Sequence, residues 1–216
     1  MGAVTVNRDE VLRYLGYRQQ EADDTVVELA DTCLEELREC AAAKYVCRTF
    51  TMDIRGACVS FGGVAVHSDM LANHLEGCRE VIAFAGTLGA SVDRLIHRYS
   101  QTTMSRAVVM QAAATAMLEA YCDEWMGELA LQARSRGLFL RAQFGPGYGD
   151  FAISHQADML ALLDSGRRIG LTMTDSCMLI PTKSLTCLLG LTADEGSCHM
   201  VKCAACDNVE CAFRRV

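Results

Sequence analysis

The segment Arg141–Asp150 combines residue types that can bind a small ligand. Three glycines and one proline fall between positions 145 and 149, directly after a run that predicts a strand. Glycine lets a ligand approach the main chain, so that backbone N–H and C=O groups can pair with an adenine edge or a carboxylate. Tyr148 adds a flat ring with one hydroxyl, and Arg141 adds a guanidinium that can hold a carboxylate through two hydrogen bonds. An ordinary tight turn between a strand and a helix is the alternative, because turns use the same residue types.

The C-terminal cysteines form a second group of residues that could carry out chemistry. Cys198, Cys203, Cys206 and Cys211 follow the spacing C-x4-C-x2-C-x4-C. The first three positions match plant-type ferredoxins, in which the fourth cysteine lies much farther along the chain. Structural zinc sites more often pair two C-x2-C units, and this segment has one. We therefore expect an iron–sulfur cluster on these four thiols. The alternatives are a zinc site, to which His199 could add a nitrogen ligand, and thiols without a metal.

Composition restricts the class of protein. The chain has 216 residues, of which 51% are hydrophobic and 22% charged, so it can bury a core and is not disordered. Its net charge of −7 opposes nucleic-acid binding. The longest stretch without a charged residue, 56–68, has 13 residues, whereas a membrane span needs about 20.

Cysteine usage and the first residues bear on the cellular compartment. No basic region followed by an apolar run is seen near position 1, and we expect a cytoplasmic protein. In a reducing compartment the 12 cysteines are not expected to form structural disulfides. We interpret those outside the tail, such as Cys33, Cys40 and Cys122, as small buried apolar residues.

Hydrophobic periodicity and turn residues predict the elements that must position these groups. The expected helices cover residues 9–15, 23–43, 69–76, a segment from 91 onward, 105–136 and 157–163. The expected strands cover residues 45–54, 57–61, 81–84, 138–144, 178–180 and 184–191. Strands mixed irregularly with helices indicate the α+β class.

Two of these segments, in this order and at this spacing, resemble the activation domain of cobalamin-dependent methionine synthase, in the stand-alone form that some bacteria encode separately. Phe144–Asp150 is similar to the proline-glycine-tyrosine motif of that family, and the strand Pro181–Gly190 follows roughly 35 residues later. Weaker matches are Glu10–Tyr17, the turn Thr87–Gly89 and the alanine-rich helix 105–136. The resemblance extends over about residues 6–192.

The resemblance implies a single C-shaped α+β domain with a mixed, mostly antiparallel, twisted sheet and packed helices, followed by a short cysteine-rich tail. It implies an S-adenosylmethionine-binding domain over residues 1–192 and a metal-binding tail over 193–216. In that family the domain docks on the cobalamin module once the cobalt has been oxidised, and S-adenosylmethionine with one electron restores methylcobalamin. The domain aims the sulfonium methyl group at cobalt, which is a positioning role, so we expect no catalytic side chain.

Carried over residue by residue, the resemblance predicts that S-adenosylmethionine is held by Arg141, Gln143, Gly145, Pro146, Gly147 and Tyr148. Two positions depart from the family pattern. Gln143 stands where the family usually has an arginine, five residues before the tyrosine, and Leu189 is aligned with a ligand-contacting tyrosine of the long methionine synthases. Arg141 lies two residues before Gln143, on the same face of a strand, and could supply the missing charge.

The expected partners follow from what the chain lacks. It has no Asp-x-His-x-x-Gly, the motif expected of a module that gives cobalt its lower axial histidine, so cobalamin would come on a partner. We expect that partner to be a corrinoid-carrying methyltransferase or methionine synthase core, with an electron donor such as flavodoxin or ferredoxin. The chain would then be a component of methionine synthase activity. The alternative is a non-catalytic iron–sulfur or zinc-binding redox or sensor module that keeps the fold.

Overall fold

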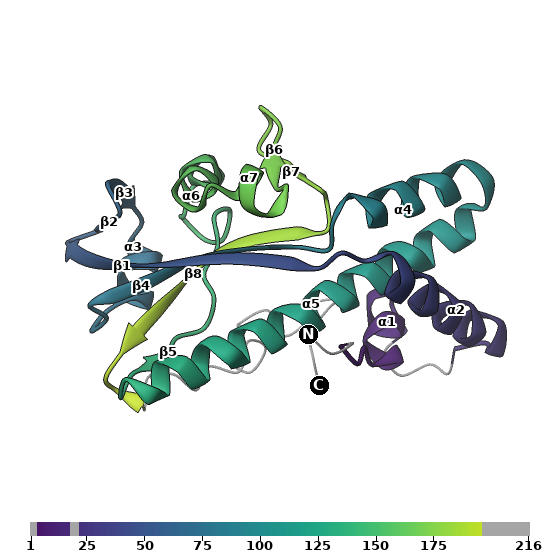
Figure 1. Cartoon of the computed structure of the whole chain (residues 1–216), viewed down its shortest axis with the longest axis horizontal. Helices are drawn as coiled ribbons and strands as arrows, with labels where there is room; N and C mark the ends of the chain where they lie inside the picture. Colours follow the sequence, from purple (N-terminus) through teal and green to yellow (C-terminus); the bar gives the residue numbers. More distant parts are fainter. Residues whose placement is uncertain (1–3, 18–21, 196–216) are drawn as a thin grey trace.

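An open six-stranded antiparallel sheet runs along the molecule in the strand order β3-β2-β1-β4-β8-β5 (Figure 1). The computed structural model describes residues 4–17 and 22–195, and the structural statements below refer to them. The strands of this sheet are β1 Lys44–Arg55, β2 Cys58–Phe61, β3 Val64–His67, β4 Glu80–Thr87, β5 Phe139–Leu140 and β8 Ser184–Thr192. A separate hairpin consists of β6 Thr172–Met173 and β7 Leu179–Ile180.

The helices are distributed irregularly between these strands along the chain. They are α1 Arg8–Tyr14, α2 Asp24–Cys40, α3 Asp69–His74, α4 Ala90–Thr102, α5 Met104–Ser135, α6 Gln156–Leu163 and α7 Ser165–Ile169, with one turn of 3-10 helix at Ile153–His155. Within the described ranges, no helix has both the length and the apolar character that crossing a lipid bilayer requires. The predicted α+β class is confirmed, and all strand pairs of the described sheets are antiparallel.

Most predicted elements form within a few residues of their expected bounds. The long helix predicted over 105–136 is α5, and the strand predicted over 184–191 is β8. The helix predicted over 69–76 is α3, and Ser68 caps it, because its hydroxyl accepts a 2.9 Å hydrogen bond from the backbone N–H of Leu71. These elements have strong local signals, which explains the agreement.

The prediction of a strand over 138–144 is wrong in length. β5 contains Phe139 and Leu140, and Phe144 then forms an isolated bridge with Leu188 of β8. Arg141 still bonds the carbonyl oxygen of Gly190, and the register shifts by one residue before the bridge. Between them the carbonyl oxygen of Ala142 is bonded by the side chain of His74 in α3. The structure also contains β3, α7 and the β6–β7 hairpin, of which only a strand at 178–180 was predicted.

Both faces of the sheet are covered by helices (Figure 1). On one face, Trp125 of α5 packs against Phe84 of β4 with their ring centroids 6.1 Å apart. On the other face, α3, α6 and α7 cover a core that includes Val81 and Leu188. A further core, at the end of the molecule away from β2 and β3, joins α1, α2 and α4 to the first half of α5. The segment 141–150 lies on the face that carries α3 and α6.

Candidate ligand-binding site

The segment 141–150 holds the C-terminal end of α3. The Arg141 Nη2 atom donates a 2.6 Å hydrogen bond to the carbonyl oxygen of Glu76, just beyond the helix. His74, the last residue of α3, bonds the carbonyl oxygen of Ala142 at 2.8 Å through Nε2. A carbonyl oxygen only accepts, so this nitrogen carries the proton. Arg141, predicted as a ligand clamp, therefore also has a structural contact.

Burial dominates the electrostatics of His74. It lowers the pKa of this imidazole below its usual value of 6.5, and the neighbouring positive charge of Arg141 lowers it further. The hydrogen bond to Ala142 acts in the opposite direction but does not overcome burial. His74 is therefore mainly neutral at pH 7, which is the form suited to a half-buried position beside an arginine.

The same segment caps the N-terminal end of α3 through Asp150. Its carboxylate accepts hydrogen bonds from the Ser68 hydroxyl, from the backbone N–H of Asp69 at 2.8 Å and from that of Met70 at 3.3 Å. The bond from Ser68, followed by those from the backbone, lowers the pKa of Asp150 below its usual value. Because the segment binds both ends of α3, the helix and the segment form one structural unit.

Aromatic rings line the middle of the segment. Phe144 is buried, and its ring lies 5.1 Å from that of His74 and 5.1 Å from that of Tyr148, which stands perpendicular to it. Phe151 stacks on Phe144 at 6.3 Å. The Tyr148 side chain is 61% exposed although its edge contacts this row. It therefore presents an aromatic surface to a ligand or a partner protein.

The glycines of the segment have contacts that explain them without a ligand. A Cβ atom on Gly145 would lie 2.8 Å from the carbonyl oxygen of Thr186, so the close approach to β8 requires glycine. Gly147 has a φ of +89° and donates a 2.7 Å hydrogen bond to the carbonyl oxygen of Phe151. The alternative of a tight turn is thus correct as a local description, and it does not exclude a ligand on the exposed side.

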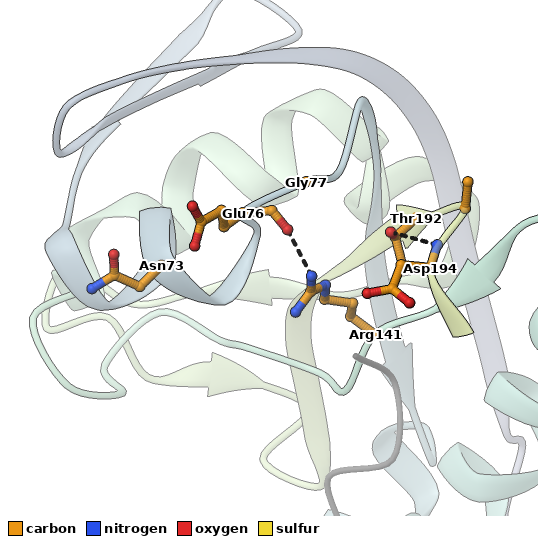
Figure 2. A pocket seen from close by; sticks show the side chains of 7 residues that line it. Asn73, Glu76, Gly77, Arg141, Thr192 and Asp194 are labelled. Atoms are coloured by element: carbon orange, nitrogen blue, oxygen red, sulfur yellow. Dashed lines mark hydrogen bonds between the residues drawn. The ribbon is translucent and has the colours of Figure 1, made fainter. Parts of the chain in front are cut away.

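An open pocket of about 410 Å³ lies beside the C-terminal end of α3 (Figure 2). Arg141 points into it from one side, and Asp194 lies on the other. Its complete lining is Asn73, Glu76, Gly77, Arg141, Thr192, Ala193 and Asp194. Of the six residues predicted to hold S-adenosylmethionine, Arg141 lines this pocket and the other five do not. The predicted residues therefore lie in two places: Arg141 at the pocket, and the other five in the segment 143–148 outside its lining.

Two buried polar atoms of the segment have no partner among the described residues. They are Nε of Arg141, a hydrogen-bond donor, and Oε1 of Gln143, an acceptor. A buried group without a partner costs about 1–3 kcal/mol, and a water, an ion or a ligand can satisfy it. The backbone of Arg141 is fixed by a 2.8 Å hydrogen bond from its N–H to the carbonyl oxygen of Gly190.

Leu189 lies on the opposite face of β8. It is buried in the core formed with Trp125 of α5, whereas the neighbouring Gly190 faces Arg141, whose Cγ atom would lie 3.5 Å from a Cβ there. Leu189, which is aligned with a ligand-contacting tyrosine of the family, therefore lies in the core under α5 and faces away from the segment 141–150. His74 and Glu76 were missed by sequence reasoning, because no local pattern links them to residues more than sixty positions later.

Metal ligands can be assessed only in part. Cys198, Cys203, Cys206 and Cys211 lie outside the described residues. In residues 4–17 and 22–195, no group of three or more histidine, cysteine, aspartate or glutamate side chains is placed so that it could hold a metal ion.

The fold is similar to a solved structure, the crystal structure of the MetH reactivation domain bound to AdoHcy. The TM-score is 0.62 at 16% sequence identity, with 79% of this chain and 66% of that chain covered. The chain thus spans about two thirds of the length of the protein in that structure. No protein-family model and no curated protein matches the sequence. At this identity the likeness shows the fold, which agrees with the resemblance noted from the sequence.

Proposed function

We propose that this protein binds S-adenosylmethionine and serves the reductive reactivation of a cobalamin-dependent methyltransferase, most plainly methionine synthase. The observation that carries the proposal is the likeness in fold to the MetH reactivation domain bound to AdoHcy, over 79% of this chain. The FGPGYGD segment at 144–150, which resembles the family's motif, supports the proposal independently of the fold.

The two unpartnered atoms suit the amino-acid half of S-adenosylmethionine. The Nε–H of Arg141 would donate to the ligand carboxylate, and Oε1 of Gln143 would accept from its ammonium group. The exposed ring of Tyr148 offers a surface for the adenine, and Gly145, Pro146 and Gly147 shape the backbone beside it. The side chain of Gln143 thus replaces the family's arginine by a neutral acceptor, and Arg141 supplies the charge.

In this proposal the residues of the chain bind and orient. S-adenosylmethionine supplies a sulfonium methyl group, the partner's cobalamin accepts it after one-electron reduction by a donor such as flavodoxin or ferredoxin, and S-adenosylhomocysteine is left. No side chain of the segment needs to act as a nucleophile or general base. The contribution of the fold is the position and direction of the methyl group.

The C-terminal tail is the second part of the proposal. Residues 1–192 would form the ligand-binding domain, and Cys198, Cys203, Cys206 and Cys211 of the tail 193–216 would ligate an iron–sulfur cluster. Four thiols within 14 residues favour a metal, because closely spaced thiolates repel one another when nothing compensates their charge. Zinc on the same thiols is the competing assignment.

Calorimetric titration with S-adenosylmethionine tests the first part. Arg141→Ala is expected to weaken binding roughly tenfold or more, the usual effect of losing a charge-assisted hydrogen bond. Because Arg141 also holds Glu76, each variant is checked by circular dichroism and thermal unfolding before its affinity is compared. Arg134→Ala, an exposed arginine of α5, is the matched control.

The same titration distinguishes the proposed function from the alternative, a redox or sensor module that does not bind S-adenosylmethionine. The contact of Arg141 with the Glu76 carbonyl is the observation that favours it, because a guanidinium held there is less available to a ligand. Absence of heat at millimolar S-adenosylmethionine, in protein that is folded, would contradict the proposed function and leave the redox or sensor module.

A further inference from the structure

One edge of β1 is open over most of its length. Residues 44–51 pair with β4, and only residues 52–55 pair with β2 on the other edge. Backbone groups of successive residues in an antiparallel strand point to alternate edges. The N–H of Met52 bonds the carbonyl oxygen of Arg79, which lies on the β4 side. The backbone groups of Tyr45, Cys47, Thr49 and Thr51 therefore point to the open edge.

Nothing in the described part of the chain occupies this edge. The sheet has no strand beside residues 44–51 there, and no loop or side chain of residues 4–17 or 22–195 forms a hydrogen bond with these four backbones on that side. Figure 1 shows β1 as a long strand running in front of the sheet. Eight residues of a strand extend over about 27 Å, which is long enough for a further strand of ordinary length to pair with them.

Residues 44–51 include two basic side chains and no acidic one. Lys44 and Arg48 are exposed, and neither forms an ion pair within the described residues. The helix α7 packs against β1 and carries the exposed Arg168, whereas its neighbour Arg167 pairs with Asp164 at 3.8 Å. Burial raises the pKa of the Cys47 thiol in β1, and the positive charge of Arg168 opposes that rise.

Several carboxylates on or around β1 are already engaged. Asp53 of β1 pairs with Arg55 at 2.8 Å. Glu80 forms a 2.6 Å ion pair with Arg136, and Glu128 accepts a 3.4 Å hydrogen bond from the Tyr45 hydroxyl. A basic edge with its neighbouring acids occupied attracts negative charge in a protein whose net charge is −7. It also disfavours a second copy, since two β1 strands paired about a two-fold axis would bring lysine and arginine side chains together.

We propose that the free edge of β1 is a docking site at which an acidic, extended segment of a partner protein adds as a further antiparallel strand. The four outward backbones supply hydrogen bonds, and Lys44, Arg48 and Arg168 select for glutamate or aspartate on the incoming strand. The inference goes beyond the proposed function and does not depend on S-adenosylmethionine binding.

Fluorescence anisotropy with two labelled peptides tests the proposal. One peptide of about eight residues alternates glutamate with valine, and the other carries lysine in place of each glutamate. The acidic peptide is expected to bind the full chain at least tenfold more tightly. Thr49→Pro should weaken that binding at least tenfold, because it removes an outward N–H and none of the bonds to β4. Thr49→Ala keeps the N–H and should bind as the natural protein does.

A charge-reversal variant keeps the test decisive if Thr49→Pro does not fold. Arg48→Glu leaves the backbone unchanged and should shift the preference toward the basic peptide by roughly tenfold. Equal affinity for the two peptides, no binding at millimolar concentration, or an unaffected Thr49→Pro variant would overturn the proposal. A dimer seen by sedimentation and dissociated by Thr49→Pro would also overturn it, and would assign the edge to a second copy of the chain.

Discussion

The carboxylate of Asp150 accepts a 2.8 Å hydrogen bond from the backbone N–H of Asp69, 81 positions earlier in the chain. This bond ties the residue that ends the FGPGYGD segment to the start of α3, and Arg141 ties the other end of the segment to Glu76. The candidate ligand loop is thereby held at two points by the same short helix. A substitution that displaces α3 should consequently displace the loop, and a substitution in the loop should displace α3.

Replacing Asp150 by asparagine should lower the stability of the protein at neutral pH and above. The folded pKa of Asp150 is below that of an unfolded chain, so its carboxylate stabilises the fold above about pH 4, and that contribution is lost as the pH falls through the folded pKa. Urea midpoints of Asp150→Asn and the natural protein should differ at pH 7 and converge at acidic pH. Asp175→Asn, in the turn between β6 and β7, is the matched control. Equal midpoints at pH 7 would contradict the capping role.

His74 predicts a pH dependence in a different range. Its folded pKa lies below 6.5, so the unfolded chain binds the proton more tightly, and stability falls as the pH drops below about 6.5. Free energies of unfolding measured at intervals between pH 7.5 and pH 5 should show this decline in the natural protein and less of it in His74→Gln. His97→Gln, exposed on α4, should retain the full decline. If His74→Gln retained it too, the half-buried neutral imidazole would not be its cause.

Two glycine-to-alanine changes should have opposite effects. In Gly145→Ala the new methyl group would lie 2.8 Å from the Thr186 carbonyl oxygen, and we expect a loss of about 1–3 kcal/mol as the loop moves from β8. Gly127 is exposed within α5, and a methyl group added there would have no neighbouring atom within 4 Å, so Gly127→Ala should gain about 0.5–1 kcal/mol from helix propensity. Chemical denaturation measures both changes. A neutral Gly145→Ala would show that the contact with β8 relaxes freely.

The tail proposal predicts a metal content. Protein prepared without oxygen should carry iron and acid-labile sulfide, and a variant with serine at the four tail cysteines should lose both. Cys58→Ser, in β2, is the control and should retain them. The tail variant should bind S-adenosylmethionine as the natural protein does. Zinc without iron would assign the tail as a structural zinc site, and the absence of any metal would leave it as free thiols.

Sequence reasoning was most successful where the signal is local. The period of α5, the serine before α3 and the apolar run of β8 depend on neighbours within a few positions, and these elements formed as predicted. The fold class followed from the order of such elements. The segment 138–144 also has strand-forming residues, but its pairing with β8 breaks between Arg141 and Phe144, where the Ala142 carbonyl oxygen is bonded by the distant His74.

The candidate site was predictable in composition and not in geometry. The FGPGYGD pattern identified the loop, and its glycines form the tight turn that was the alternative interpretation, with Gly145 closely approaching β8. The approach of a ligand to these glycines stays a prediction. The contacts of Arg141 with Glu76, and of Asp150 with Ser68, join residues far apart in the chain, and no spacing rule predicts them. Nε of Arg141 and Oε1 of Gln143 are buried without a partner among the described residues, and no spacing rule predicts that either.

The length of α5 has a consequence for how the protein unfolds. Its first half, including Ala113 and Met117, is buried with α1, α2 and α4, and its second half, including Trp125 and Leu129, is buried against the sheet. One continuous backbone hydrogen-bond ladder therefore couples two hydrophobic cores, so neither can melt without fraying the helix that the other needs. Fluorescence of Trp125, the single tryptophan, reports on the sheet core, and circular dichroism at 222 nm reports chiefly on the helices. The two signals should follow one cooperative transition, and the N-terminal helices should not persist as an autonomous folding unit.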